Sequence, residues 1–530
     1  MAAEANGNGK KRARVEGPGG VVDGLIDFLN EAWTPFHATL EAKRLLLAAG
    51  YQQLSEVRLL LLRPLPRRRR RRRRGCPLSR PSRARAAPAP PPSRPPRGAR
   101  GIGPAADGRR LPGRRQEEPW ALEKGGRYFF TRNMSSVVAF AVGQRYRPGN
   151  GFVIVGAHTD SPCPKLKPNP HKKKGGCITV GCQSYGGGIW HTWFDRDLGV
   201  AGRVIARGAS GEIEHKLVKI EQPIMRIPSL AIHLDREVNS KFGVNFQEHM
   251  APVLAVAANK TAGGKEEENL LMARVAAEVG CEAEDILDFE LQLCDVQPST
   301  VGGLENEFIF SGRLDNLCNS YLGLKALLDS TPDAAALAEE PNIRSVALFD
   351  HEECGSVSAQ GAGSSIMAEL VRRVSALLCE DQEPSQVLVP ACRRSFLVSA
   401  DMAHALHPNY QDKHCANHAP KFHDGVVVKH NANQRYATNS VTATLFREIG
   451  KVAGVPVQEF VVRADLGCGS TIGPSLSADM SVRTVDVGLA QLSMHSIREM
   501  CGTKDVEYSY EHFRALYEHF SRIDATLNVD

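Results

Sequence analysis

Short apolar runs that alternate with helical patterns constrain this fold more than any other feature of the chain. GFVIVGA (151–157) is apolar almost without interruption, which is typical of a parallel strand covered on both faces. From residue 306 onward, strands are expected at 344–349, 395–400, 457–463 and 482–487, and helices at 314–329, 363–378, 437–453 and 508–526. This alternation predicts an α/β fold with a mostly parallel sheet.

The middle of the chain has a different pattern. Residues 161–305 contain short β-like pieces, a glycine bend at Tyr185–Gly188 and only one or two helices, which predicts a β-rich domain. Residues 20–160 and 306–530 are then the two parts of the α/β domain that it interrupts. The first part is expected to begin with a helical region at 20–50, broken near Pro35.

Two segments are expected to be disordered, namely the Gly-rich tail 1–19 and the Arg/Pro-rich stretch 57–118. The latter holds 20 Arg, 12 Pro and 3 acidic residues, and the rest of the chain holds 46 basic and 56 acidic residues, so the net charge of +7 comes from this stretch. The run Arg67–Arg74 suggests an alternative function, nucleic-acid binding. Because it lacks interleaved aromatic residues and an adjoining folded module, no specific nucleic-acid partner is expected.

Several protein classes are excluded by absent patterns. The sequence contains no run of about 18 apolar residues, which argues against a membrane span. Its first 20 residues lack the apolar stretch of a secretory signal. The 13 cysteines are scattered and include no CxxC pair, which argues against a disulfide framework and a zinc ribbon. A cytoplasmic protein is therefore expected.

Metal-ligand residue types follow several of the predicted strands. The first strand leads into His158 and Asp160, and later strands lead into Glu352–Glu353, into Asp401 and His404, and into His495; Asp315 opens a helix. In open α/β sheets, ligands gather at the carboxyl ends of the strands, so these distant residues are expected to meet in one crevice.

The set of donors exceeds what one tetrahedral ion needs. Two histidines and four carboxylates suit two zinc-like ions that share a bridging carboxylate and a bridging water. Asp160, two residues after His158, is a candidate acceptor for the second ring N–H of that histidine. In the Glu352–Glu353 pair, one carboxylate can bind metal while the other stays free as a general base.

Long ordered motifs also resemble a known family. GAHTDSP, YGGGIWHTWFDRDLGVAGRV, RIPSLAIHL, RLDN, DHEECGS, SADMAHALHPNY, NQRYATN and QLSMHSIREM are similar to those of the aspartyl aminopeptidases, the M18 family of dizinc metallopeptidases, and IWHT resembles plant members. The resemblance covers about 20–56 and 119–530. It implies a proteolytic domain interrupted at 161–305 by a dimerisation domain. The chain departs from the family at Cys354, where Val is usual, and at 57–118, where the family has a short linker.

The resemblance implies a role for each residue of the centre. One Zn²⁺ is expected on His158 and Asp401 and another on Glu353 and His495, with Asp315 bridging them; Mn²⁺ or Co²⁺ is expected to be able to replace one ion. Glu352 is implied as the base that activates the zinc-bridged water.

The resemblance also implies the substrate and the assembly. The family removes unblocked N-terminal Asp or Glu from peptides. An acidic side chain in a water-poor pocket needs a cation, and Lys429 matches that position, with Tyr436, Asp401 and His404 as further contacts. His233 is implied to reach the active site of a neighbouring subunit in a tetrahedral dodecamer. An alternative of the same chemical class is a dizinc deacylase of N-acyl amino acids.

Overall fold

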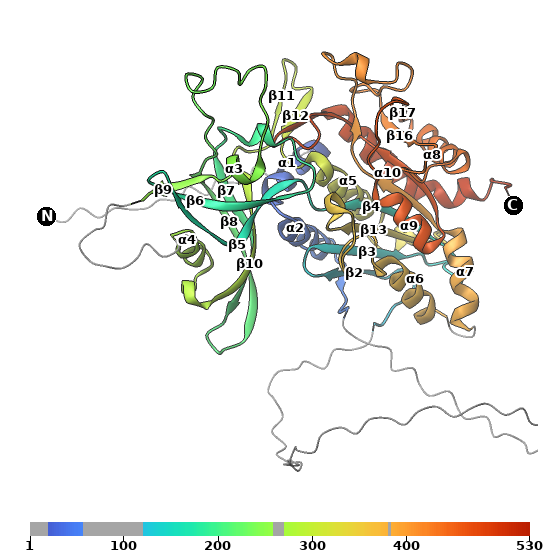
Figure 1. Ribbon diagram of the computed structural model, residues 1–530. Helices are drawn as coiled ribbons and strands as arrows, with labels where there is room; N and C mark the ends of the chain where they lie inside the picture. The colour runs from blue at the N-terminus through green and yellow to red at the C-terminus, as the bar shows by residue number, and fades with distance from the viewer. Residues whose placement is uncertain (1–19, 57–119, 258–269, 380–382, 530) are drawn as a thin grey trace, which may run out of the picture. The chain divides into compact units, whose positions relative to one another are not determined.

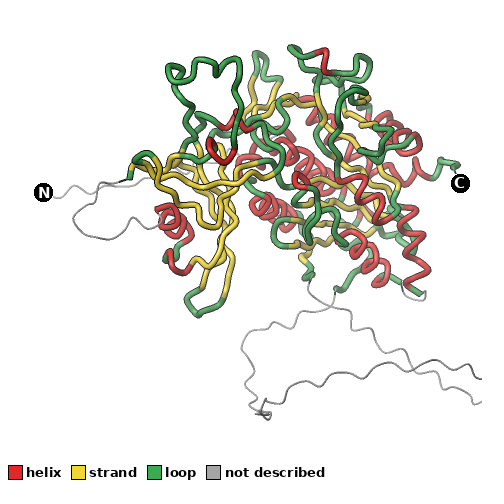
Figure 2. Tube along the Cα trace, viewed as in Figure 1, coloured by secondary structure: helices red, strands yellow, loops and turns green. Residues whose placement is uncertain are grey.

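Three β-sheets organise the part of the chain that the computed structural model describes, residues 20–56, 120–257, 270–379 and 383–529 (Figures 1 and 2). The tail 1–19 and the stretch 57–118, both expected to be disordered, lie outside these ranges. No helix in the described ranges is long and apolar enough to cross a membrane.

The largest sheet has nine strands in the described residues. In spatial order they are β1 (Gln52–Gln53), β2 (Arg127–Arg132), β3 (Ser136–Val142), β13 (Ile343–Phe349), β4 (Phe152–His158), β14 (Phe396–Ala400), β18 (Arg483–Gly488), β16 (Val426–His430) and β17 (Val457–Val461). Each neighbouring pair within β13, β4, β14 and β18 is parallel, as are β1–β2 and β16–β17. The other three pairs are antiparallel. The predicted α/β fold with a mostly parallel sheet is confirmed, and the sheet is mixed.

Helices cover both faces of this sheet (Figure 1). One face packs against α1 (Val21–Glu31), α2 (Pro35–Ala48), α5 (Leu314–Ser330), α8 (Ser440–Ala453) and α10 (Thr503–Asp524). The other face packs against α6 (Ile366–Leu377), α7 (Pro384–Arg394) and α9 (Ile472–Met480). Along β4, Val153 and Val155 face the first layer and Phe152 and Ile154 the second, which is why this strand is apolar throughout.

Helix boundaries follow local capping chemistry. The expected helix at 437–453 begins at Ser440, because the side chain of Asn439 caps it by accepting the N–H groups of Val441 and Thr442. It ends at Ala453 and is followed by Gly454, whose φ of 68° is the left-handed conformation that glycine adopts readily. Helices α7 and α9 were not expected, because each contains proline or glycine within a short pattern.

The second sheet is antiparallel and has six strands in the described residues. Its order is β8 (Ile213–Met225), β7 (Leu198–Arg207), β10 (Ile286–Asp295), β5 (Cys163–Lys174), β6 (Cys177–Tyr185) and β9 (Val253–Val256), with the helices α3 (Phe246–His249) and α4 (Leu270–Val279) beside it. All of these elements fall within 161–305, where the sequence predicts a β-rich domain. That this range is a separate dimerisation domain stays a prediction.

The third sheet in the described residues has five strands. Its strands are β11 (Thr300–Gly302), β12 (Phe308–Ser311), β20 (Glu499–Gly502), β19 (Ala490–Leu492) and β15 (Ala403–His404). Short 3-10 turns lie at Trp190–Trp193, Ala283–Asp285, Ala335–Leu337, Glu352–Cys354 and Gln411–Lys413.

Candidate metal centre

Three neighbouring strands of the nine-stranded sheet bring the first ligand types together. β4 ends at His158, which is in register with Phe349 at the end of β13, and the Glu352–Cys354 turn follows directly. β14 pairs with the other side of β4 and ends one residue before Asp401. The carboxyl ends of these parallel strands therefore form one edge, as the sequence predicts.

His495 reaches this edge by a different route from the one expected. The strand predicted at 482–487 is β18, but β19 intervenes, and His495 lies in the turn between β19 and β20 of the five-stranded sheet. Asp315 lies in the first turn of α5 with φ −83° and ψ 101°, so its backbone is not yet helical there. Two sheets and one helix end thus supply the donors.

The donors form two groups that share Asp315. In the first, His158 Nε2 lies 3.3 Å from Asp315 Oδ1 and 3.6 Å from Asp401 Oδ1. In the second, His495 Nε2 lies 3.3 Å from Asp315 Oδ2 and 3.4 Å from Glu353 Oε2. Either group has donor atoms close enough together to hold an ion, and so does a third combination of His158 with Glu352 and Glu353.

The donor set fits divalent cations. Asp315 Oδ1 and Glu353 Oε1 are buried and accept no hydrogen bond from the described residues, an arrangement that is costly unless a cation compensates it. Burial and the neighbouring Asp315 carboxylate raise the pKa of Glu353 well above its usual range. Burial alone would raise the pKa of Asp315 as well, but the neighbouring imidazoles of His158 and His495 lower it. Mixed imidazole and carboxylate donors are those that zinc accepts.

Hydrogen bonds orient both histidine rings. His158 Nδ1 lies 3.0 Å from the backbone oxygen of Asp160 and 3.4 Å from its Oδ1, so the nearer acceptor is the carbonyl. The Asp160 carboxylate also accepts the backbone N–H groups of Glu352 and Glu353 at 3.1 and 3.0 Å. His495 Nδ1 donates to the carbonyl of Gly187 at 2.9 Å. In each ring Nε2 is left to face the carboxylates.

Glu499 is a functional candidate that the sequence reasoning missed. Its buried carboxylate accepts the backbone N–H of Asp315 at 3.0 Å and that of His495 at 2.8 Å, so one side chain holds the backbones of two ligands. Burial and the charge of Asp315 raise the pKa of Glu499 to about 8. Its only sequence signal is its place four residues after His495.

Glu352 is placed to act as a base. Its side chain is 14% exposed, and its Oε2 lies 3.8 Å from His158 Nε2. Burial raises the pKa of Glu352 to about 8, and the charge of Asp401 adds to this effect while His158 opposes it. A carboxylate that titrates near neutral pH can both take up and release a proton.

A cavity of about 460 Å³ opens onto these groups. It is lined by Asp315, Glu352, Glu353, Asp401, Met402, His404, Lys429, Tyr436, Gly469, Ser470, Thr471, Met494 and His495. The Lys429 ammonium is buried, lies 3.6 Å from Asp401 Oδ2 and stands 5.5 Å from the centre of the Tyr436 ring. The His404 side chain is exposed to the solvent of this cavity, and the surrounding protein atoms together with the charge of Lys429 lower its pKa.

His233 does not line this cavity. It is exposed in the segment that follows β8, where Leu230, Leu234 and Phe242 are also exposed, by 60%, 75% and 45%. The structure therefore brings together every residue that the sequence predicts for the site except this one.

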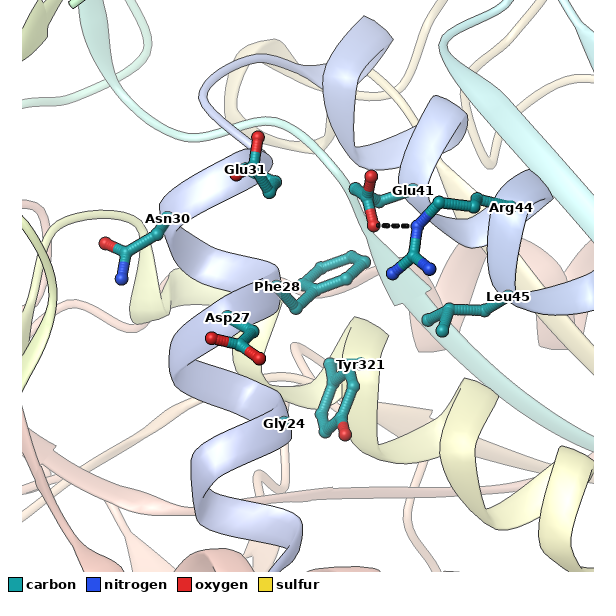
Figure 3. Close-up of a pocket in the computed structure, with 9 residues that line it drawn as sticks. All are labelled: Gly24, Asp27, Phe28, Asn30, Glu31, Glu41, Arg44, Leu45 and Tyr321. Atoms are coloured by element: carbon teal, nitrogen blue, oxygen red, sulfur yellow. Dashed lines mark hydrogen bonds and ion pairs between the residues drawn. The ribbon is translucent and has the colours of Figure 1, made fainter. Parts of the chain in front are cut away.

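A second hollow, of about 530 Å³, lies against α1, α2 and α5 (Figure 3). Its lining residues are Gly24, Asp27, Phe28, Asn30, Glu31, Glu41, Arg44, Leu45 and Tyr321. Arg44 pairs with Glu41 at 2.8 Å, and the rings of Phe28 and Tyr321 lie 5.4 Å apart. The described residues that line it include no histidine, so it lacks the imidazole donors of the first cavity.

Comparisons with known proteins identify the relatives of this chain. The family model described as aminopeptidase I zinc metalloprotease (M18) matches residues 113–517. A probable aspartyl aminopeptidase of Ricinus communis is 50% identical, with 96% of each chain covered, and an aspartyl aminopeptidase of Aspergillus oryzae is 41% identical over 96% of this chain and 97% of its own.

Solved structures of similar proteins agree with this match. The structure of the Ape4 and Nbr1 complex superimposes with a TM-score of 0.81 at 37% identity, covering 96% of this chain and 87% of the other. The structure of the S. cerevisiae mApe1 dodecamer superimposes with a TM-score of 0.74 at 27% identity, covering 96% of this chain and 99% of that one.

Proposed function

The chain belongs to the M18 family of zinc metallopeptidases, and from this premise we propose that it is an aminopeptidase that removes an unblocked Asp or Glu from the N-terminus of peptides. The observation that carries the proposal is the placement of buried Lys429 in the same cavity as the two donor groups. A cation at that place complements an acidic side chain, and the carboxylates around it complement a free terminal ammonium.

We assign the first metal position to His158 and Asp401 and the second to Glu353 and His495, with Asp315 shared, so that each subunit holds two Zn²⁺ ions; Mn²⁺ or Co²⁺ is expected to be able to take one of these places. Such ions supply Lewis acidity and lower the pKa of water. Support comes from the two groups of donor atoms and from the orphaned oxygens of Asp315 and Glu353.

Glu352 is the proposed general base. It faces the cavity beside His158 while its neighbour Glu353 faces His495, so the two adjacent carboxylates have different surroundings. Glu352 takes the proton of the attacking water and passes it to the leaving amine. Lys429 holds the acidic side chain of the substrate, and Tyr436 and His404 complete the walls around it.

The substrate class can be tested with four substrates. The purified protein, supplied with Zn²⁺, is assayed on peptides that begin with Asp, Glu or Ala and on N-acetyl-Asp. We expect hydrolysis of the first two in preference to the third and none of the fourth. Efficient release of acetate from N-acetyl-Asp would instead favour a deacylase.

The roles of the glutamate pair can be separated by metal analysis. Glu352→Gln is expected to retain both ions and to lose activity by roughly 10²–10⁴-fold, the usual loss for a general base. Glu353→Gln is expected to retain only one ion. If Glu352→Gln is the variant that loses an ion, the two roles are reversed.

The proposal includes a homo-oligomer, a tetrahedral dodecamer, in the cytoplasm. A solved relative is described as a dodecamer, and the exposed apolar residues around His233 are suited to an interface between copies. Apart from Cys379, the cysteines within the described ranges are free thiols, which agrees with a reducing compartment. We propose that His233 completes the active site of a neighbouring subunit and stabilises the developing oxyanion, at roughly 2.7–4 kcal/mol per donor.

Mixing of subunits tests this arrangement. His233→Ala and Glu352→Gln proteins are each expected to be inactive, whereas an oligomer reassembled from both contains some sites with Glu352 and His233 intact. Recovered activity supports the shared site. No recovery after verified subunit exchange means that His233 serves its own chain.

A further inference from the structure

Three residues at the end of β6 contact the metal centre from outside its set of ligands. Tyr185, Gly186 and Gly187, here called the 185–187 bend, leave the six-stranded sheet and pass beside the ends of β4 and β13. None of the three is among the donors, yet each lies against a different part of the centre.

Tyr185 fixes the Asp160 carboxylate. Its hydroxyl donates to Asp160 Oδ2 at 2.6 Å, and this carboxylate also accepts the backbone N–H groups of Glu352 and Glu353. The Lys165 ammonium lies 3.7 Å from the centre of the Tyr185 ring and holds its other side. Tyr185 therefore acts on the glutamate pair through Asp160.

Gly187 fixes the ring of His495. Because a carbonyl oxygen only accepts, the 2.9 Å contact requires that Nδ1 of His495 carries a proton, and Nε2 is the ring nitrogen that faces Asp315 and Glu353. The backbone N–H of Ile189, two residues further on, donates to the carbonyl of His495 at 2.9 Å. The ring and the backbone of this ligand are thus held by the same short segment.

Gly186 lies against Glu353. Its φ is 69°, and a Cβ at this position would lie 3.1 Å from the Cβ of Glu353 and 3.4 Å from its carbonyl oxygen. At Gly187, by contrast, an added Cβ would meet no atom of the described residues within 4 Å. Adjacent glycines therefore differ in what a methyl group would disturb.

We propose that the 185–187 bend is a positioning element that sets the zinc affinity of the centre. Tyr185 acts through Asp160 on Glu353, Gly186 allows Glu353 to approach, and the Gly187 carbonyl selects the tautomer of His495. Partners of this kind typically change metal affinity by 10–100-fold when they are lost. The inference rests on the proposed function, since it assumes that zinc is the resident ion.

Competition with a chelator on the full-length protein tests the proposal. Tyr185→Phe removes only the hydroxyl and is expected to raise the dissociation constant of the more weakly bound zinc ion about 10-fold. Gly186→Ala is expected to raise it by at least as much. Gly175→Ala is the matched control and is expected to bind zinc as the unaltered protein does, because Gly175 also has a positive φ (58°), lies in the turn between β5 and β6, and would bring an added Cβ within 4 Å of no atom of the described residues.

Thermal denaturation of the metal-free proteins separates positioning from general damage. Tyr185→Phe is expected to unfold at nearly the unaltered temperature without metal, and to gain less from added Zn²⁺. If Gly186→Ala fails to fold, Tyr185→Phe alone decides the matter. Unchanged zinc affinity in Tyr185→Phe, in a protein that binds two ions and cleaves Asp-peptides, overturns the proposal and leaves the function intact. If the unaltered protein binds no zinc, both fall.

Discussion

Replacement of Lys429 by methionine is the sharpest test of how this enzyme selects its substrate. The Lys429 side chain is only 3% exposed, and among the described residues that line the cavity it is the one Lys or Arg. Methionine has a similar length and no charge, so the change removes the cation and leaves most of the volume. A substrate carboxylate would then enter a buried pocket without a partner.

The size of the effect follows from the charge and its burial. Two unit charges about 4 Å apart interact by about 4 kcal/mol at an effective dielectric constant of 20. Since each 1.36 kcal/mol is a factor of ten, kcat/KM for peptides that begin with Asp or Glu is expected to fall by roughly 10²–10³-fold. Peptides that begin with Ala gain nothing from the ammonium, so their kcat/KM is expected to change by less than about tenfold.

Steady-state assays on Asp- and Ala-peptides measure this difference, with Lys429→Arg as the charge-preserving control. Zinc content must be measured in parallel, because Lys429 Nζ lies 3.6 Å from Asp401 Oδ2 and its loss also alters the surroundings of that proposed ligand. If kcat/KM falls equally for the two substrates while both ions stay bound, Lys429 does not recognise the substrate side chain.

Three further results are expected. Replacement of residues 57–119 by a short Gly/Ser linker should leave kcat/KM unchanged and raise the free energy of unfolding by about 1–3 kcal/mol, because a shorter loop is easier to close; an inactive, unfolded product would refute this. Burial lowers the pKa of His512 to about 3 in the folded protein, below its value of 6.5 in an unfolded chain. The neutral imidazole therefore contributes fully to the free energy of unfolding above pH 6.5, and this contribution falls by about 1.4 kcal/mol per pH unit as the pH drops toward 3. In urea titrations, the free energy of unfolding should depend less steeply on pH for His512→Phe, and an equal dependence would contradict the assignment. Glu499→Gln, which weakens its acceptance of two ligand amides, should lower zinc affinity by roughly tenfold in chelator competition, and unchanged binding would assign it a packing role only.

The sequence predicts those parts of the fold that rest on side-chain periodicity. β4, β13 and β14 are apolar on both faces because helices cover both sides, and runs of this kind are readable in the sequence. By contrast, α7 carries Pro390 inside it and α9 carries Gly473 near its start, so tertiary packing overrides local propensity there.

The same division holds at the metal centre. His158 and Asp401 follow apolar strands and could be found by residue type, and the structure places them together. Glu499 and Gly187 could not be found in this way, because each acts on a ligand through a backbone group. Such roles depend on the path of the backbone in the folded protein, so residue type alone does not indicate them.

The two ends that flank residues 57–119 lie side by side at the rim of the nine-stranded sheet. Trp120 Nε1 donates to the carbonyl of Ser55 at 2.7 Å, and β1 and β2 on either side are parallel neighbours, with β3 between them and β13. A polypeptide inserted here begins and ends almost at the same point. This junction is therefore a natural place to graft a fluorescent reporter or an affinity module, whose own termini need only lie close together, while the catalytic strands remain uncut.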